Sequence, residues 1–236
     1  MDELHLFSMS LSCTRRAPLC RESAFTLVEL LVVIAIIAVL AALLFPALGS
    51  ARANAQRTQC VSQIGSLGKA LLLYTQDNEG QLPLNASPTY GNINSGIWFD
   101  YAALLLPYLN MTSDQAAANP TIFRCPVKKT GTMARPDYLF CGANQLNPSF
   151  PGLAGVRISQ MAKPASTLLL VEVCAAVPYS LHAQTGQSTN ATANAKSVVC
   201  FADGHTDFIP IYWDGSGAPT FHANPPASYG YQWSPN

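Results

Sequence analysis

Residues suited to metal or acid–base chemistry gather in the C-terminal half of the sequence. The candidates are His182, His205, His222, Glu172, Asp203 and Asp207. Imidazole and carboxylate groups bind metal ions, and on a strand His205 and Asp207 would point to the same face. The linear sequence sets no distance among these side chains, so a hairpin with polar residues in solvent is the favoured interpretation.

Other patterns that would indicate a ligand or a reaction are few. Calcium is a separate candidate because Asp203 and Asp207 supply hard oxygen ligands, but no acidic loop of regular spacing surrounds them. The sequence has no Walker loop, no dinucleotide fingerprint, no Gly-x-Ser-x-Gly elbow and no His-Glu-x-x-His motif. We therefore expect a protein that is not an enzyme, with no metal and no cofactor.

Another chemically notable residue, Glu29, lies near the start of the apolar run "AFTLVELLVVIAIIAVLAALLFPALG" at residues 24–49. The run can supply the roughly 20 helical residues that cross a bilayer. A carboxylate within hydrocarbon costs on the order of 2.5 kcal/mol or more, so its default interpretation is functional, with a partner. Alternatively, Glu29 is one turn from Phe25 and reaches the headgroups of a simple anchor.

The flanks of the run bear on its orientation. Arg15, Arg16 and Arg21 precede it, which places residues 1–24 in the cytoplasm by the positive-inside tendency, although Arg52 and Arg57 follow it. A secretory signal peptide is the alternative, since "ALGSARANAQ" holds a weak Ala-x-Ala-like site. The run is longer than the about 7 to 15 apolar residues of such peptides, which favours a transmembrane helix.

The helix is expected to continue beyond the membrane. Pro46 lacks an N–H donor and should kink or loosen it locally. Residues 47–74 then place apolar side chains at helical spacing, at Cys60, Ile64, Leu67, Leu71 and Tyr74. The polar residues Arg52, Asn54, Arg57 and Gln59, which precede Cys60, should face solvent or neighbouring subunits. The turn residues of "DNEGQLP" should end the helix.

The remaining chain reads as short elements in an α+β domain. A short helix limited by Pro107 is expected at 102–109, and strands or extended loops at 121–127 and 137–144. Better strands are 166–175 and 196–211, the second with an Asp-Gly hairpin turn at 202–205. These elements predict an antiparallel sheet packed on the long helix, followed by a loosely structured C-terminus of loops and coil.

Composition limits the partners. The 236 residues are 49% hydrophobic and hold 13 basic and 13 acidic side chains, so the formal net charge is zero. The chain can bury a core of its own, and its charge gives no reason to expect nucleic acid.

The segment "AFTLVELLVVIAIIAVLAALLFPAL" resembles the N-terminus of type IV pilins and of the pseudopilins of type II secretion systems. The resemblance implies cleavage between Ala24 and Phe25 by prepilin peptidase and methylation of the new Phe25 amino group. It also implies that Glu29 meets the amino terminus of a neighbouring subunit. The family usually has Gly where this chain has Ala24, and translation from Met9 is an alternative start.

C-terminal features resemble the pilin-type proteins of planctomycetes and verrucomicrobia, with a C-terminal "H-X9-DG" element. Matching pieces are Cys125-Pro126, Pro164 with Ser166-Thr167 leading to Glu172, and 201–205. The spaced His is missing, because Ala193 occupies the position separated from Asp203 by nine residues. No role for that His can be carried over.

Seven cysteines are present, and Cys13 and Cys20 would leave with the leader. Cys125 and Cys141 flank a turn-rich segment and are the first candidates for a disulfide in an oxidising compartment. A bridge between Cys174 and Cys200 is the second choice, and buried free thiols are the alternative for that pair.

Together these observations predict a leader at 1–24, a helix at 25–75 with its transmembrane half at 25–48, and an external domain at 76–236. The resemblance implies a structural subunit in the inner membrane, with its C-terminal domain outside the cytoplasm, assembled into a pilus-like or secretion filament. Its implied partners are prepilin peptidase/methyltransferase, like subunits and other pseudopilins, and an assembly platform. The alternative is a non-polymerising binding or enzymatic domain on a pilin-like anchor.

Overall fold

The structure, a computed structural model, describes residues 26–84, 100–118, 121–127, 137–142, 152–175, 181–182, 194–215 and 224–235. The leader, Ala24, Phe25 and His222 lie outside this part of the chain. The chain divides into two compact units, Met1–Pro46 and Ala47–Asn236, which are described separately below.

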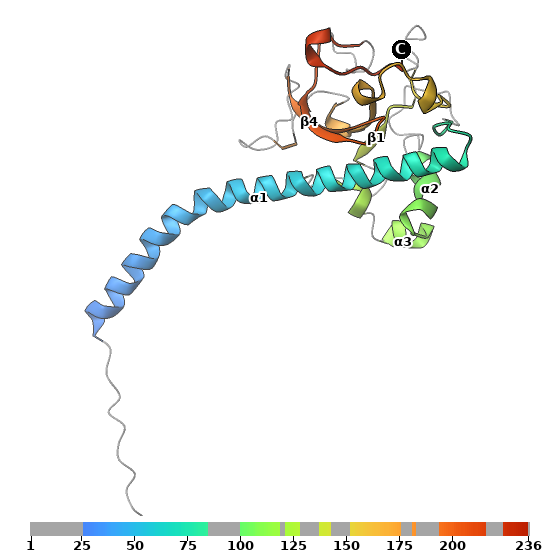
Figure 1. The fold of residues 1–236 in the computed structure, drawn as a ribbon. Coiled ribbons are helices and arrows are strands. Elements are labelled where there is room, and N and C mark those ends of the chain that lie inside the picture. Colours follow the sequence, from blue (N-terminus) through green and yellow to red (C-terminus); the bar gives the residue numbers. More distant parts are fainter. Residues whose placement is uncertain are drawn as a thin grey trace, which may run out of the picture. The chain divides into compact units, whose positions relative to one another are not determined.

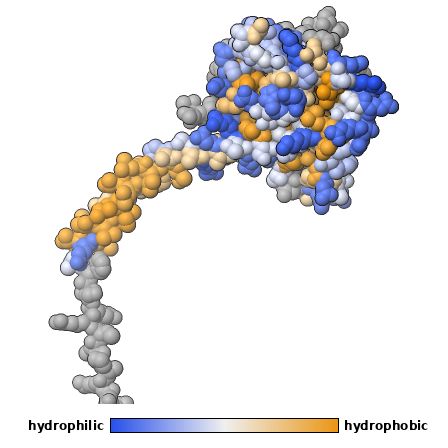
Figure 2. All heavy atoms as spheres, viewed as in Figure 1, coloured by the Kyte–Doolittle hydropathy of each residue, from blue (hydrophilic) through white to orange (hydrophobic). Residues whose placement is uncertain are grey.

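In the first unit, the described residues belong almost entirely to the start of helix α1 (Leu27–Asp77). Its large apolar side chains from Leu27 to Leu48 are exposed, and Figure 2 shows a mostly hydrophobic surface on the face in view. An 18-residue window of this helix has a mean hydropathy of 3.2 and none of it is buried, so the helix is long and apolar enough to span a membrane. Such a surface requires lipid or other apolar helices around it.

Helix α1 runs without a break through Pro46, so the predicted continuation past this proline is confirmed. The predicted amphipathic face is confirmed as well: Cys60, Ile64, Leu67 and Leu71 are buried. Of the residues predicted to face outward, Arg57 is half-buried, with its guanidinium carbon 5.0 Å from the centre of the Phe208 ring.

The second unit contains a four-stranded antiparallel sheet with the strand order β1-β2-β3-β4. Figure 1 labels its two edge strands, β1 and β4. The strands are β1 (Tyr138–Phe140), β2 (Leu168–Glu172), β3 (Lys196–Phe201) and β4 (Thr206–Pro210). The predicted Asp-Gly hairpin joins β3 to β4, and Gly204 has a φ of +92°, which favours glycine. The α+β class with an antiparallel sheet on a long helix is therefore confirmed.

The later part of α1 packs closely against this sheet. Gly68 faces Cys200 on β3, and a Cβ added at Gly68 would overlap the Cys200 sulfur. Gly68 follows Cys60 and Ile64 at intervals of four residues, so all three lie on one helix face. The absence of a side chain at Gly68 thus allows the close approach that also directs Cys60 toward the sheet.

Short helical segments connect α1 to the sheet. Helix α2 (Asp100–Leu105) is followed by a 3₁₀ turn at Pro107–Leu109, where a single helix over 102–109 was predicted, and then by α3 (Ser113–Ala118). Pro107 begins the new turn because proline is tolerated in the first turn of a helix but not within it. The segment 121–127 forms no strand but a 3₁₀ turn, Thr121–Phe123. Its Thr121 carbonyl accepts a 2.7 Å hydrogen bond from the Gln63 amide of α1, which takes the place of a strand partner.

The C-terminal segment covers the sheet face opposite α1. Leu168, Val171, Val199 and Phe201 form a second core with Tyr231 and Trp233 from this segment, and all are buried. The backbone of 224–235 is irregular, as predicted, with one 3₁₀ turn at Ala227–Tyr229. The prediction of loose structure is wrong for this part, because two large aromatic side chains are buried against the sheet.

Candidate functional site

The acid in the apolar helix takes part in a hydrogen-bonded cap. The Thr26 N–H and hydroxyl each donate to Glu29 Oε2 at 2.8 Å, and the Glu29 N–H donates to Thr26 Oγ1 at 3.2 Å. This reciprocal pattern is a capping box, which satisfies N–H groups that the first turn of a helix leaves without partners. The spacing Thr-x-x-Glu before an apolar run is the sequence signal of this cap.

The cap engages only one carboxylate oxygen. Within the described residues, Glu29 Oε1 has no hydrogen-bond partner, and Leu27, Val28, Leu30 and Leu31 around it are more than half exposed. One oxygen of a charged group is therefore left without a partner among the described residues, next to exposed apolar side chains. Burial of this surface would require a donor for that oxygen.

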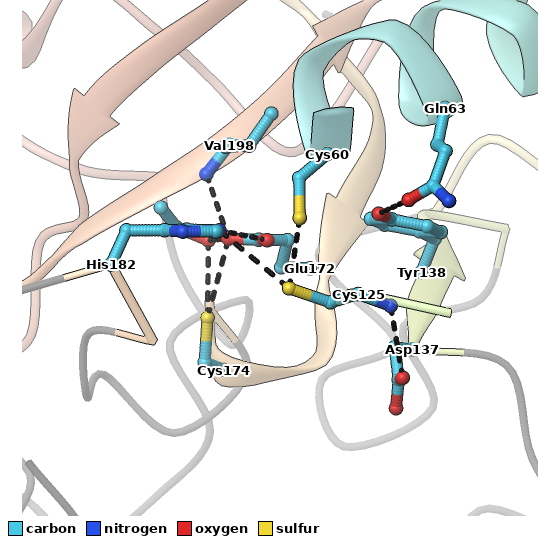
Figure 3. A network of polar contacts seen from close by, with 10 residues as sticks. Cys60, Gln63, Cys125, Asp137, Tyr138, Glu172, Cys174, His182 and Val198 are labelled. Carbon is cyan, nitrogen blue, oxygen red and sulfur yellow. Dashed lines mark hydrogen bonds and ion pairs between the residues drawn. The ribbon is translucent and has the colours of Figure 1, made fainter. Parts of the chain in front are cut away.

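A second group of polar residues lies inside the second unit, Ala47–Asn236 (Figure 3). It comprises Cys60 from α1, Cys125 after the turn at Thr121–Phe123, Glu172 at the end of β2, and His182. Their relative exposures are 0%, 2%, 0% and 9%. The sulfurs of Cys60 and Cys125 are 2.9 Å apart, Cys125 Sγ is 3.7 Å from His182 Nε2, and this nitrogen is 2.8 Å from Glu172 Oε1. We call these four residues the Cys/His/Glu cluster.

The Glu172 side chain is oriented by strand β3. Its Oε2 accepts hydrogen bonds from the Val198 N–H at 3.0 Å and the Ser197 hydroxyl at 3.1 Å, and the Cys174 sulfur lies 3.6 Å away. Oε1 is thereby directed toward His182 and the two sulfurs (Figure 3). A register shift in β2 between Leu168 and Leu170 sets which side chains face α1, and Leu170 and Glu172 share that face.

Cys125 is held by its neighbours on the other side. Its N–H donates to Asp137 Oδ2 at 3.1 Å, and the Tyr138 hydroxyl donates to Gln63 Oε1 at 2.7 Å, which ties β1 to α1 beside Cys60. The contact with Cys60 and burial raise the pKa of the Cys125 thiol, against a smaller opposing effect of His182. Without a metal ion, this thiol therefore keeps its proton.

The two ring nitrogens of His182 lie in different surroundings. Burial alone would lower its pKa, but contacts with Cys125 and Glu172 raise it to about 9. Nε2 faces the cluster, whereas Nδ1 is buried and has no hydrogen-bond partner in the part of the chain that the structure describes. Two sulfurs, one nitrogen and one oxygen, all within 4.8 Å of one another, are ligands of the kinds that bind a metal ion.

Comparisons with known proteins bear on the N-terminal site. Residues 19–45 match the family model described as the prokaryotic N-terminal methylation motif. A segment of 58 residues is 47% identical to the type II secretion system core protein G of Pectobacterium carotovorum subsp. carotovorum. In its N-terminal motif the chain is pilin- or pseudopilin-like. The similarity covers 25% of this chain and 37% of that relative, and no solved structure matches the chain.

The polar residues singled out from the sequence of this pilin-like protein separate into two places. Glu172 and His182 meet in the interior, with side-chain exposures of 0% and 1%. Asp203 and His205 pair in the exposed hairpin, where His205 Nδ1 lies 2.6 Å from Asp203 Oδ1, and Asp207 is exposed on β4. The prediction of a solvent-facing hairpin is confirmed for these last three residues and wrong for Glu172 and His182.

The predicted disulfides are not formed in this structure. Cys125 and Cys141 are free thiols, and the sulfur beside Cys125 belongs to Cys60. Cys174 and Cys200 are buried free thiols as well, the alternative that the sequence left open. Proximity along the chain suggested Cys141, but the helix face that packs on the sheet brings Cys60 to Cys125 across 65 positions of sequence.

Sequence reasoning missed the association of Cys60 and Cys125 with Glu172 and His182. Cys60 fitted the apolar helix face as a small hydrophobic residue, so its sulfur drew no attention as a ligand. His182 and Glu172 were candidate ligands from the sequence, but only in a group with the hairpin residues Asp203 and His205. A Cys on a buried helix face, a Cys-Pro turn and an acid ending an apolar strand were each visible signals, but nothing in the sequence connected them.

Proposed function

We propose that this pilin-like protein is a structural, non-enzymatic subunit that is cut between Ala24 and Phe25, methylated at Phe25 and assembled into a filament. The observation that carries the proposal is Glu29: an acid in the first turn of an exposed apolar helix, next to the predicted cleavage site. The match to the N-terminal methylation motif supports both the cleavage and the methylation.

Assembly gives the charge of Glu29 a partner. In a bundle of apolar helices, the free Glu29 oxygen would accept a hydrogen bond from the Phe25 ammonium of a neighbouring subunit. Either charge alone would be costly to bury, whereas the pair offsets the desolvation of both groups. Because the pair joins fixed positions on two helices, it also sets the axial stagger between subunits.

The proposed setting is the inner membrane. The apolar half of α1 anchors the chain as a single-pass protein, with residues 47–236 outside the cytoplasm. Prepilin peptidase/methyltransferase, like subunits, other pseudopilins and an assembly platform are the proposed partners. The similarity to a protein named as a core component of type II secretion makes a secretion filament the first candidate among pilus-like assemblies.

One observation favours a second candidate, a membrane-anchored domain that does not polymerise. The capping box gives Glu29 a local role that needs no neighbouring subunit. In that case, the acid would only start the helix near the headgroups.

Two substitutions separate these roles. Glu29→Gln keeps an oxygen that can accept the Thr26 hydrogen bonds but removes the charge, whereas Thr26→Ala removes the cap's side chain and keeps the charge. We expect intact-mass analysis of membrane-extracted protein to show a chain starting at methylated Phe25. Cross-linking in membranes should show ladders of higher-order species for wild type and Thr26→Ala, and their loss in Glu29→Gln.

Two results would support a membrane anchor that does not polymerise. An uncut chain that remains monomeric in all three forms contradicts the proposed function. Equal ladders in wild type and Glu29→Gln would show that the charge of Glu29 does not direct assembly.

A further inference from the structure

We propose that the Cys/His/Glu cluster is a structural zinc site, with Cys60 Sγ, Cys125 Sγ, His182 Nε2 and Glu172 Oε1 as its four ligands. This inference concerns the second unit, Ala47–Asn236, and does not depend on whether the chain forms filaments. It replaces the expectation from sequence that the protein holds no metal.

The separations of the four atoms fit one small cation. Zinc binds sulfur at about 2.3 Å and nitrogen or oxygen at about 2.0 to 2.2 Å, so ligands around a tetrahedral ion are roughly 3.3 to 3.8 Å apart. The four atoms lie within 4.8 Å of one another, and the Cys125 Sγ to His182 Nε2 distance is 3.7 Å. The two short separations, 2.9 Å between sulfurs and 2.8 Å between Nε2 and Oε1, need to open by only about 1 Å or less.

The ligand types select zinc among the common ions. Two cysteine sulfurs exclude magnesium and calcium, which prefer all-oxygen shells. Two thiolates, an imidazole and a carboxylate in a tetrahedral arrangement suit zinc. The four residues are at most 9% exposed, so no ligand position is left open to water or substrate. A closed shell of four protein ligands is typical of a structural site and not of a catalytic one.

The surroundings of Glu172 provide the outer support that a metal-bound carboxylate needs. Oε2 is fixed by the Val198 N–H and the Ser197 hydroxyl, which leaves Oε1 free to turn to the ion. Hydrogen bonds of this kind orient ligands and strengthen metal binding. An ion pair between Glu172 and His182 alone would satisfy these two residues, but it would not account for two buried thiols that point at the same place.

The charges and protons balance without an oxidant. Binding of Zn²⁺ releases three protons to solvent, one from each thiol and one from the His182 imidazolium, and His182 then binds as a neutral imidazole with its remaining proton on Nδ1. Two thiolates and the Glu172 carboxylate exceed the charge of the ion by one, and this excess lies beside the N–H and O–H donors on Oε2. A disulfide between Cys60 and Cys125 is the competing outcome and would release two electrons as well as two protons.

The site would join parts of the chain that are distant in sequence. Cys60 belongs to α1, Cys125 to the turn beside it, Glu172 to β2, and His182 to the segment before β3. A single ion would thus clamp the helix to the sheet.

The test uses the full chain in detergent, in a Cys13→Ser/Cys20→Ser background so that leader thiols bind no metal. Protein purified without chelator should contain about one zinc ion per chain by elemental analysis. Replacement of zinc by Co²⁺ should give the sulfur-to-cobalt charge-transfer bands and the intense visible bands of a tetrahedral thiolate site. Cys125→Ser and His182→Gln should each lose the zinc, whereas Cys141→Ser, a matched cysteine outside the cluster, should keep it.

The wild-type measurement decides the outcome even if a variant does not fold. Circular dichroism identifies the variants that fold, and only these enter the comparison. Failure of the reduced, folded wild type to take up Zn²⁺ or Co²⁺ would overturn the proposal. A peptide containing Cys60 linked to Cys125 in protein isolated from cells, with no zinc bound, would overturn it in favour of the disulfide.

Discussion

Replacement of Gly68 by alanine tests the close packing of α1 on the sheet that brings Cys60 to the Cys/His/Glu cluster. A methyl group at Gly68 overlaps the sulfur of Cys200, which is itself buried with 0% exposure. Gly65, one turn earlier on the same helix, is a matched control. A Cβ at Gly65 meets only the Thr206 Cγ2 at 3.4 Å, an ordinary van der Waals contact.

The two substitutions share one effect and differ in another. Replacing glycine by alanine within a helix stabilises it by about 1 kcal/mol in both cases. Overpacking a filled core costs about 1 to 3 kcal/mol and applies only at Gly68. Gly65→Ala should therefore raise the free energy of unfolding by about 1 kcal/mol. Gly68→Ala should lower it by up to about 2 kcal/mol, a difference of about 1 to 3 kcal/mol between the variants.

Urea unfolding of the full chain in detergent, followed by tryptophan fluorescence, measures this difference. Cys200→Ala provides a further check because it removes the overlapping sulfur. In that background, Gly68→Ala should lose most of its penalty, and the double-mutant cycle should give a coupling energy of about 1 to 3 kcal/mol. Equal stability of Gly68→Ala and Gly65→Ala, with no coupling to Cys200, would refute the packing of α1 described above.

Two further predictions concern other parts of the second unit. Trp233→Ala should lower the free energy of unfolding by about 3 to 5 kcal/mol, because Trp233 is 4% exposed in the second core; a change within experimental error would show that the C-terminal segment does not pack on the sheet. For Asp203, partial burial would raise the pKa, but hydrogen bonds from the His205 N–H and side chain lower it overall. The stability that Asp203→Asn removes should accordingly be present in full above the unfolded pKa of about 3.9, and be lost as the pH falls through the lower folded pKa. Urea midpoints of both forms between neutral and acid pH measure this, and a difference that grows on acidification would contradict it.

Much of the fold follows from local pattern. The apolar face with Cys60, Ile64, Leu67 and Leu71 repeats at helical spacing, and the hairpin around Gly204 uses an Asp-Gly pair. Both patterns depend on residues close in sequence, so propensity and periodicity are enough. The segment at Thr121–Phe123 was mispredicted because its apolar composition suits a strand. In the structure it forms a 3₁₀ turn, and its Thr121 carbonyl accepts a hydrogen bond from the Gln63 side-chain amide of α1.

The two candidate sites also differ in whether their residues are close together in sequence. Glu29 and the residues around it are close together in sequence, so the resemblance of this segment to pilins was enough to single out the acid. The Cys/His/Glu cluster draws its ligands from separate segments between positions 60 and 182, and in each segment the residue has an ordinary local interpretation. Cysteine fits an apolar helix face, and the acid ends a strand.

The sequence by itself determined that an apolar helix begins within a segment that resembles the N-terminus of pilins, that it continues as an amphipathic helix, and that a small antiparallel sheet follows. These features rest on interactions between residues a few positions apart. Only the tertiary structure decided that Cys125 meets Cys60 and not Cys141, and that Glu172 and His182 turn inward together. Those contacts depend on the close approach of α1 and β3 at Gly68 and on the register of β2, and long-range packing sets both.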